Sequence, residues 1–272
     1  MKLATLRIGG GTRAAILRDQ AFYALDWPDV GGVLVSGVAL LDLKPGPYVC
    51  SIADADYAPL VLRPPKIFCV GINYISHLQE LAMEQPSHPT LFSKFHTSLA
   101  GANDDIALFG MSSAIDWEAE LVAVIGKWTS KADRDQAATA IAGFCLGNDV
   151  SARDLQTRTP QWLAGKTLDA STPLGPWLVS TDEIGVRPDL ELSCSVNGTI
   201  MQHGRTGDLL FDAADLVVDI SAFCTLEPGD IIFTGTPGGI GAARQPKQFL
   251  KSGDILMTEI DGLGRCVNRL VA

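Results

Sequence analysis

Short apolar runs, several of them alternating with polar residues, recur along the chain between turns rich in Gly, Pro, Asn and Asp. In the first quarter, these runs predict three short strands and a helix, over residues 3–8, 14–18, 21–25 and 33–43. Pro64-Pro65 then stiffens the chain and marks a boundary. We therefore expect a small N-terminal domain over residues 1–64 and a larger domain over residues 65–272.

The larger part of the chain also contains more predicted strands than helices. Apolar runs bounded by turn residues predict strands over residues 66–71, 91–94, 116–126, 141–146, 177–179, 190–196, 199–202 and 231–233. Helical spacing predicts helices over residues 131–141 and 213–223, the second capped by Asp212. Asn197-Gly198 predicts a type I′ hairpin turn. Ser151 and Asp154 predict a capping box that opens a further helix.

The predicted strand at 116–126 begins with an unusual run of acidic residues, Asp116-x-Glu118-x-Glu120. Side chains alternate faces along a strand, so the three carboxylates should project from one side. They repel one another unless a positive charge lies among them. Oxygen ligands suit Mg²⁺, Mn²⁺ or Ca²⁺ rather than zinc. Taken alone, the same stretch also fits an edge strand with a solvated acidic face.

A second candidate for chemistry is the pair His77 and Glu80. In a helix these side chains lie on one face, three positions apart and within reach of each other. A carboxylate beside imidazole raises the pKa of the histidine and selects its tautomer, which suits a general base. The alternative is an ordinary exposed His–Glu pair. Residues 83–90 contain Pro86 and Pro89 and predict a mobile loop, which makes the helix a candidate lid.

Composition narrows the class of protein. A chain of 272 residues with 47% hydrophobic and 19% charged residues is typical of a globular, enzyme-sized protein. The net charge of −10 disfavours a nucleic-acid surface and an anionic membrane as partners. No apolar run reaches the roughly 18 residues of a membrane span, and Arg7 interrupts the N-terminal apolar start before a signal-peptide core can form. We expect a cytoplasmic protein.

Two other motif classes are disfavoured. The six cysteines are scattered singly, with no C-x-x-C pair, so buried reduced thiols are expected rather than a metal or disulfide framework. The glycine-rich stretch 234–241 lacks the Gly-Lys-Ser/Thr of a phosphate loop, and Pro237 removes one of the amides. Its remaining amides and threonine hydroxyls are better suited to contact a carboxylate.

Several motifs occur together in a fixed order: Lys66 to Tyr74 followed by His77 and Glu80, Asp116-x-Glu118-x-Glu120-Leu121, Asn148-Asp149-x-Ser151-Ala152-Arg153-Asp154, Gly165-Lys166, Pro173-Leu174-Gly175-Pro176, Asn197-Gly198, Pro228-Gly229-Asp230 and Thr234-Gly235-Thr236-Pro237. In this order they resemble the fumarylacetoacetate hydrolase family over roughly residues 65 to 272. The resemblance is specific to the family, though not to one activity. It implies an α+β fold, with a mixed β-sheet roll and a small N-terminal α/β domain, and a homodimer.

The resemblance also implies roles for individual residues. Glu118, Glu120 and Asp149 would bind Mg²⁺ or Mn²⁺, with Ca²⁺ as an alternative, while Asp116 matches the acidic run without being a ligand. His77 and Glu80 would form a dyad that activates water. The remaining residues carried over are Lys166, as the cation beside the metal, and the substrate contacts Arg153, Gln156, Gly235 and Thr236.

A metal that stabilises an enolate supports more than one reaction. The first hypothesis is a hydrolase that cleaves a C–C bond of a 2,4-dioxo acid, such as an acylpyruvate, to a pyruvate-type product and a carboxylic acid. The alternative is a decarboxylase or isomerase of oxaloacetate-like or 2-hydroxy-dienoate substrates at the same site. A metal-stabilised binding module without turnover is a third hypothesis. Specificity is expected from side chains at the distal end of the substrate, among them Phe92, Lys94, Phe95, His96 and the 81–90 loop.

Overall fold

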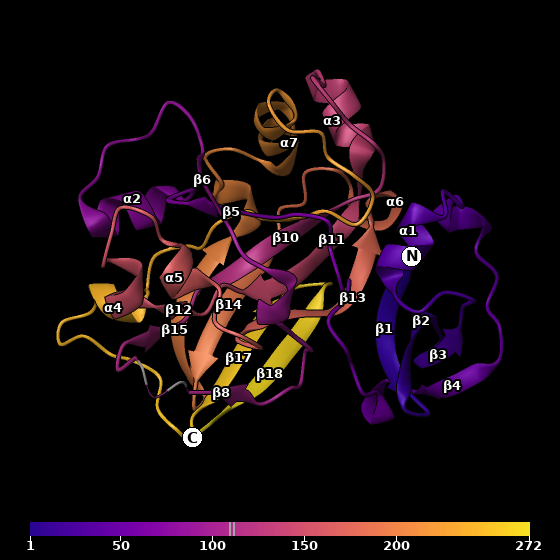
Figure 1. Ribbon diagram of the computed structural model, residues 1–272, viewed down its shortest axis with the longest axis horizontal. Coiled ribbons are helices and arrows are strands. Elements are labelled where there is room, and N and C mark those ends of the chain that lie inside the picture. Colours follow the sequence, from indigo (N-terminus) through magenta and orange to yellow (C-terminus); the bar gives the residue numbers. More distant parts are fainter. Residues whose placement is uncertain (109, 111) are drawn as a thin grey trace.

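The computed structural model describes residues 1–108, 110 and 112–272, which form a mixed α+β fold rich in strands (Figure 1). The strands are β1 (Lys2–Ile8), β2 (Gly11–Arg18), β3 (Ala21–Ala24), β4 (Tyr48–Ser51), β5 (Ile67–Gly71), β6 (Thr90–Ser93), β7 (Leu99–Ala100), β8 (Ile106–Ala107), β9 (Ile115–Asp116), β10 (Ala119–Ile125), β11 (Ile141–Asn148), β12 (Ser151–Ala152), β13 (Thr172–Ser180), β14 (Glu191–Val196), β15 (Thr199–Arg205), β16 (Ile231–Phe233), β17 (Ile255–Ile260) and β18 (Gly264–Val271).

The helices are short and lie between these strands. The α-helices are α1 (Val30–Val35), α2 (Ile75–Leu81), α3 (Arg134–Ala140), α4 (Arg153–Gln156), α5 (Leu163–Lys166), α6 (Thr181–Ile184) and α7 (Ala213–Ser221). Single turns of 3₁₀ helix are η1 (Leu40–Asp42), η2 (Ile52–Asp54), η3 (His96–Ser98), η4 (Thr206–Asp208) and η5 (Gly241–Ala243). Within the described residues, no helix is long and apolar enough to cross a membrane.

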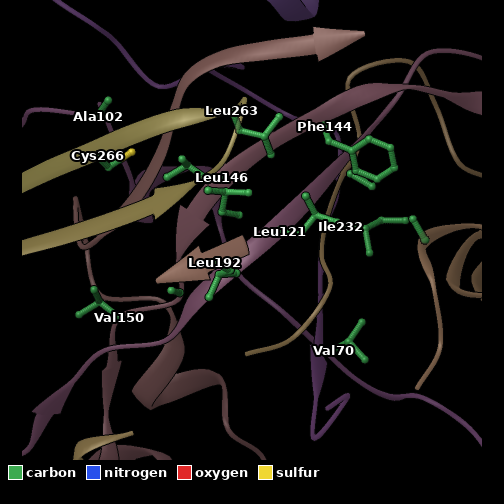
Figure 2. Packing of buried hydrophobic residues seen from close by; sticks show 14 of the residues in the cluster. Val70, Ala102, Leu121, Phe144, Leu146, Val150, Leu192, Ile232, Leu263 and Cys266 are labelled. Atoms are coloured by element: carbon green, nitrogen blue, oxygen red, sulfur yellow. The ribbon is translucent and has the colours of Figure 1, made fainter. Parts of the chain in front are cut away.

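A large central sheet runs through the molecule in the order β4-β3-β2-β1-β13-β11-β10-β16-β5-β6, with β7 paired to β13. A second sheet, β15-β14-β17-β18-β8, packs against it, and β9 and β12 form a separate ribbon. The principal core lies between the two sheets, where β10 and β11 face β14 and β18. Figure 2 shows Leu121, Phe144 and Leu146 from the central sheet near Leu192 and Cys266 from the second. Burying this apolar surface between the sheets is the main force that holds them together.

The N-terminal strands continue the central sheet, because β1 pairs antiparallel with β13. Figure 1 shows β1 to β4 on the side of the molecule opposite to α2, α4 and α5. The predicted strands over residues 3–8, 14–18 and 21–25 correspond to β1, β2 and β3. The helix predicted over residues 33–43 is wrong in extent, since α1 ends at Val35 and a separate 3₁₀ turn follows. The chain bends at Gly37, whose φ of 72° lies in the left-handed region.

Several local predictions are confirmed. Asn197 and Gly198 both have positive φ, 51° and 79°, as a type I′ turn requires. Asp212 caps α7 by accepting hydrogen bonds from the Ala214 and Asp215 amides. All six cysteines are free, and four of them are buried.

The capping box predicted for Ser151 and Asp154 is wrong. Ser151 lies in β12 and donates its hydroxyl to the Asp149 carbonyl, and α4 begins only at Arg153. Asp154 instead accepts hydrogen bonds from the Ser112 hydroxyl and the Ser113 amide. Hydrogen bonds from residues more than forty positions away in the chain therefore replace the predicted capping interaction of Asp154.

Candidate active site

Two neighbouring strands bring three buried carboxylates together. Glu118 directly precedes β10 and Glu120 is its second residue, while Asp149 directly follows β11, which pairs antiparallel with β10. The Asp149 amide donates to the Glu118 carbonyl, which aligns the two chain segments. One carboxylate oxygen from each of the three residues lies within 4.8 Å of the others. The triad predicted from sequence is thus assembled in space.

Buried cations balance part of this negative charge. Lys166 Nζ lies 2.5 Å from Glu118 Oε2 and 2.8 Å from Asp149 Oδ2. Arg153 Nη1 lies 2.7 Å from Glu118 Oε1. Burial would raise the pKa of Glu118, but Arg153 and Lys166 outweigh this effect and lower that pKa to about 2. Burial together with the charges of Asp149 and Glu118 raises the pKa of Glu120 well above its ordinary value.

The triad fits a hard divalent ion. Its donors are all carboxylate oxygens, which Mg²⁺, Mn²⁺ and Ca²⁺ prefer. Asp149 Oδ1 already has a cationic neighbour, because Lys94 Nζ lies 2.7 Å away. That ammonium also donates to the Lys166 carbonyl and to the Thr172 hydroxyl. Glu120, by contrast, is buried and forms no ion pair among the described residues, so a bound cation beside it would offset its charge.

His77, which pairs with Glu80, lines the same pocket as Glu118 and Glu120. His77 Nδ1 is 3.0 Å from Glu80 Oε2, and the His77 side chain is 6% exposed. The low exposure excludes the alternative of a solvated surface histidine. Burial opposes ionisation of Glu80, but hydrogen bonds from His77 and the Gly239 amide lower the pKa of Glu80. Glu80 is therefore an ionised partner that orients the imidazole.

The pocket between these groups has a volume of about 330 Å³. Its polar lining includes His77, Glu118, Glu120, Arg153, Gln156, Lys166 and Thr236. The rest of the wall is largely apolar and includes Phe92 and Trp162, whose rings meet edge to face at 5.4 Å. Most of the residues predicted for the site therefore line one cavity. The exceptions are Asp149, Glu80 and Gly235, each of which contacts a lining residue, namely Lys166, His77 and Glu120 respectively.

The glycine-rich segment contacts carboxylates, but those of the protein itself. The Gly235 amide donates to Glu120 Oε2 at 2.7 Å, and the Gly239 amide donates to Glu80 Oε1 at 2.9 Å. Thr236 donates its hydroxyl to the Ala119 carbonyl and accepts from Gln202. Substrate binding by Gly235 and Thr236 therefore stays a prediction.

The prediction that Asp116, Glu118 and Glu120 project from one side of a single strand is wrong for Asp116. The strand breaks after Asp116, which belongs to β9 and pairs with β12. Its carboxylate accepts hydrogen bonds from the Gly241 and Ala242 amides and from Arg153 Nε. Asp116 therefore turns away from the triad and holds Arg153 in place.

Two residues of the site have functions that the sequence did not indicate. Lys94, expected at the distal end of the substrate, is instead buried beside Asp149. Gln202 accepts from the Ala119 amide and donates to the Pro237 carbonyl, so it joins β10 to the glycine-rich segment. Lys94 could have been noticed as a cation next to an apolar strand, whereas Gln202 has no local signal.

A family model named fumarylacetoacetate (FAA) hydrolase C-terminal matches residues 66–271. The chain belongs to the fumarylacetoacetate hydrolase family. Human oxaloacetate tautomerase FAHD2A, a mitochondrial protein, is 44% identical over 221 residues, which cover 80% of this chain and 70% of that protein. Fumarylacetoacetate hydrolase from psychrophilic Exiguobacterium antarcticum has a similar structure, with a TM-score of 0.90, 30% identity, and coverage of 100% of this chain and 99% of its own.

A further relative of known structure was solved with ligands. Fumarylpyruvate hydrolase from Pseudomonas aeruginosa, in complex with Mn²⁺ and pyruvate, has a TM-score of 0.70 and 30% identity, covering 80% of this chain and 97% of its own. Family membership and the α+β fold predicted from sequence are therefore confirmed, and the protein is an enzyme of this family. Hydrolysis is not confirmed, and the tautomerase relative favours the alternative hypothesis.

Proposed function

We propose that this enzyme is a divalent-metal-dependent tautomerase of oxaloacetate-like 2-oxo acids. The observation that carries the proposal is that the His77–Glu80 pair and the acidic triad flank one small pocket. Keto–enol exchange needs a base that removes a proton from the carbon next to the ketone, and a site that stabilises the resulting enolate. Similarity to an oxaloacetate tautomerase supports this reaction over hydrolysis.

Each residue of the site has a separate role in the proposed reaction. A divalent ion held by Glu118, Glu120 and Asp149 would stabilise the enolate oxygen as a Lewis acid. In the keto-to-enol direction His77 would accept the proton from carbon 3, and the enolate oxygen would then take up a proton from solvent to give the enol. In the reverse direction the enol oxygen would lose its proton to solvent, and protonated His77 would return a proton to carbon 3. Glu80 accepts a hydrogen bond from His77 Nδ1, which leaves Nε2 as the basic nitrogen.

Arg153 fits the second carboxylate of a compact diacid. Its Nε and Nη1 are occupied by Asp116, Glu118 and Gln156, but Nη2 is buried with no hydrogen-bond partner among the described residues. A guanidinium nitrogen without another partner would gain a charge-assisted hydrogen bond to a carboxylate. Apolar neighbours such as Phe92 and Trp162 leave few other polar groups for a longer polar substrate.

The test is the rate at which the ultraviolet absorbance of enol oxaloacetate decays, measured with Mn²⁺ or Mg²⁺ and with EDTA. We expect metal-dependent acceleration, which His77→Gln removes while Mn²⁺ binding is retained. His203→Gln is the matched control, because His203 forms a similar pair with Glu191 at 2.8 Å on the exposed surface. A decay no faster than the spontaneous rate, or full activity in His77→Gln, would contradict the proposal.

Hydrolysis of a C–C bond is the second candidate. It is favoured by similarity to a fumarylpyruvate hydrolase solved with Mn²⁺ and pyruvate. In that reaction His77 would deprotonate water rather than carbon. Incubation with acetylpyruvate distinguishes the two, because hydrolysis releases pyruvate and acetate. Release of CO₂ from oxaloacetate would instead identify a decarboxylase.

We also propose an oligomeric state, a cellular location and a domain boundary for this protein. We propose a homodimer, to be tested by light scattering after size-exclusion chromatography, and a cytoplasmic location, although the human relative is named mitochondrial. We also propose that residues 1–64 form a distinct N-terminal domain. The family match that begins at residue 66 supports this boundary.

A further inference from the structure

The helix that carries His77 is attached to the rest of the site by few contacts. At its N-terminal end, Asn73 bonds the Thr234 and Phe211 carbonyls. Along α2 itself, His77 and Leu78 are the buried residues of its first six positions. Figure 1 shows α2 at the periphery of the molecule, followed by a long connection to β6. Additional contacts are needed to keep such a short helix in one position.

Two consecutive amides of the glycine-rich segment provide these contacts. The Gly238 amide donates to Ser76 Oγ at 3.2 Å, and the Gly239 amide donates to Glu80 Oε1 at 2.9 Å. Glu80 thus uses one oxygen for the segment and the other for His77. A Cβ on Gly239, at φ +108°, would lie 2.3 Å from the Met201 carbonyl oxygen, so the close approach of this turn requires glycine.

The turn itself is held from behind. Trp117 Nε1 donates to the Gly239 carbonyl at 3.1 Å, and Gln202 donates to the Pro237 carbonyl at 2.9 Å. The same segment begins with the Gly235 amide on Glu120. One stretch of backbone therefore contacts both a carboxylate of the triad and the carboxylate that orients His77.

We propose that residues 235–239 form a latch that positions His77 over the acidic triad, and that Ser76 is a positioning residue acting through this latch. The inference rests on the proposed role of His77 as the base. Ser76 is exposed and lies outside the set that lines the pocket. Its function is to receive the Gly238 amide, which restricts the motion of α2 and so increases the fraction of time that His77 is directed toward the substrate.

The test compares two variants with different predicted effects. Ser76→Ala removes the acceptor of the Gly238 amide, and loss of one hydrogen bond should increase amide hydrogen exchange in α2 about two- to tenfold. We expect kcat to fall by a similar factor, while KM and Mn²⁺ affinity stay unchanged because the triad is intact. Glu80→Gln keeps an oxygen for the Gly239 amide but loses the charge beside His77, so kcat should fall while exchange in α2 stays near that of the parent enzyme.

Two further variants serve as controls. Ser76→Thr keeps the hydroxyl and should restore exchange and kcat. Ser36→Ala removes an exposed serine that directly follows α1 and likewise accepts a hydrogen bond from a backbone amide, and it should change neither quantity.

If Ser76→Ala leaves amide hydrogen exchange in α2 unchanged, the latch is refuted. It is also refuted if Ser76→Ala lowers the stability of the whole protein enough to explain the loss of kcat. If exchange rises as expected but the parent enzyme does not act on oxaloacetate, the latch stands and the proposed function fails. The two failures are therefore distinguishable.

Discussion

The substitution Lys166→Met tests how much the buried ion pairs of Lys166 contribute to the stability of the protein. Lys166 is 2% exposed and forms ion pairs with two members of the triad, Glu118 and Asp149. Methionine keeps much of the length and the apolar stem of the side chain but removes the ammonium, which lies 5.0 Å from the centre of the Phe92 ring. The substitution therefore leaves two buried carboxylates with one cation fewer while disturbing packing little.

The expected loss is large for a single residue. Removing one partner of a buried ion pair costs about 3–5 kcal/mol, because the remaining charge is left uncompensated. A native protein has only about 5–15 kcal/mol of stability in total. Burial would lower the pKa of Lys166, but Asp149 and Glu118 outweigh it and raise the pKa above its ordinary value. Its contribution is thus fully present at neutral pH and is lost only as the pH rises through that raised value.

Metal should partly reverse the loss. In the parent enzyme, the Lys166 ammonium repels an incoming cation, whereas in Lys166→Met the ion supplies the missing positive charge. We expect Mn²⁺ to stabilise the variant more than the parent enzyme, and to bind it more tightly.

The assay is urea unfolding followed by circular dichroism, with EDTA and then with Mn²⁺. Arg205→Met, which removes an exposed ion pair with Asp189, is the control and should leave the midpoint unchanged. A loss below about 1 kcal/mol in EDTA would refute the reasoning from buried charge. Equal stabilisation of variant and parent by Mn²⁺ would refute the placement of the ion beside Lys166.

Three other outcomes are expected. His77→Gln should lower the rate of enol decay by about 10²–10⁴-fold, the usual contribution of a general base, whereas His203→Gln should not. Asp212→Ala should destabilise the protein by about 1 kcal/mol at pH 7 by uncapping α7. Burial would raise the pKa of Asp212, but the Asp215 amide and Arg134 outweigh burial and lower that pKa. In urea unfolding, the parent protein should therefore be more stable than Asp212→Ala above the ordinary aspartate pKa. This stability difference should disappear as the pH falls through the lowered pKa. Mn²⁺ affinity, measured by titration calorimetry, should weaken as the pH falls, because burial and its carboxylate neighbours raise the pKa of Glu120 and protons then compete with the ion.

Features that depend on near neighbours in the chain were predictable from sequence. The hairpin at Asn197-Gly198 and the cap at Asp212 follow from backbone preferences of one or two residues. The His77–Glu80 contact follows from helical spacing alone, once the segment is helical. The pairing of Glu118 with Glu120 likewise follows from strand alternation, but the addition of Asp149 to form a triad needed the family resemblance, because Asp149 follows a different strand, β11.

Features that depend on distant partners were decided by the tertiary structure. The acidic run predicts three carboxylates on one side of a strand, yet Asp116 is turned away from the other two by the Gly241 and Ala242 amides, 125 and 126 positions later. Lys94 is buried beside Asp149 because β6 and α5 meet there, although Lys94 and Lys166 are 72 positions apart in the chain. Sequence by itself determined which side chains could act as base, ligand and cation, since these are properties of residue type and short spacing. Only the packing of strands far apart in the chain decided which carboxylates come together in the triad and which one turns away from it.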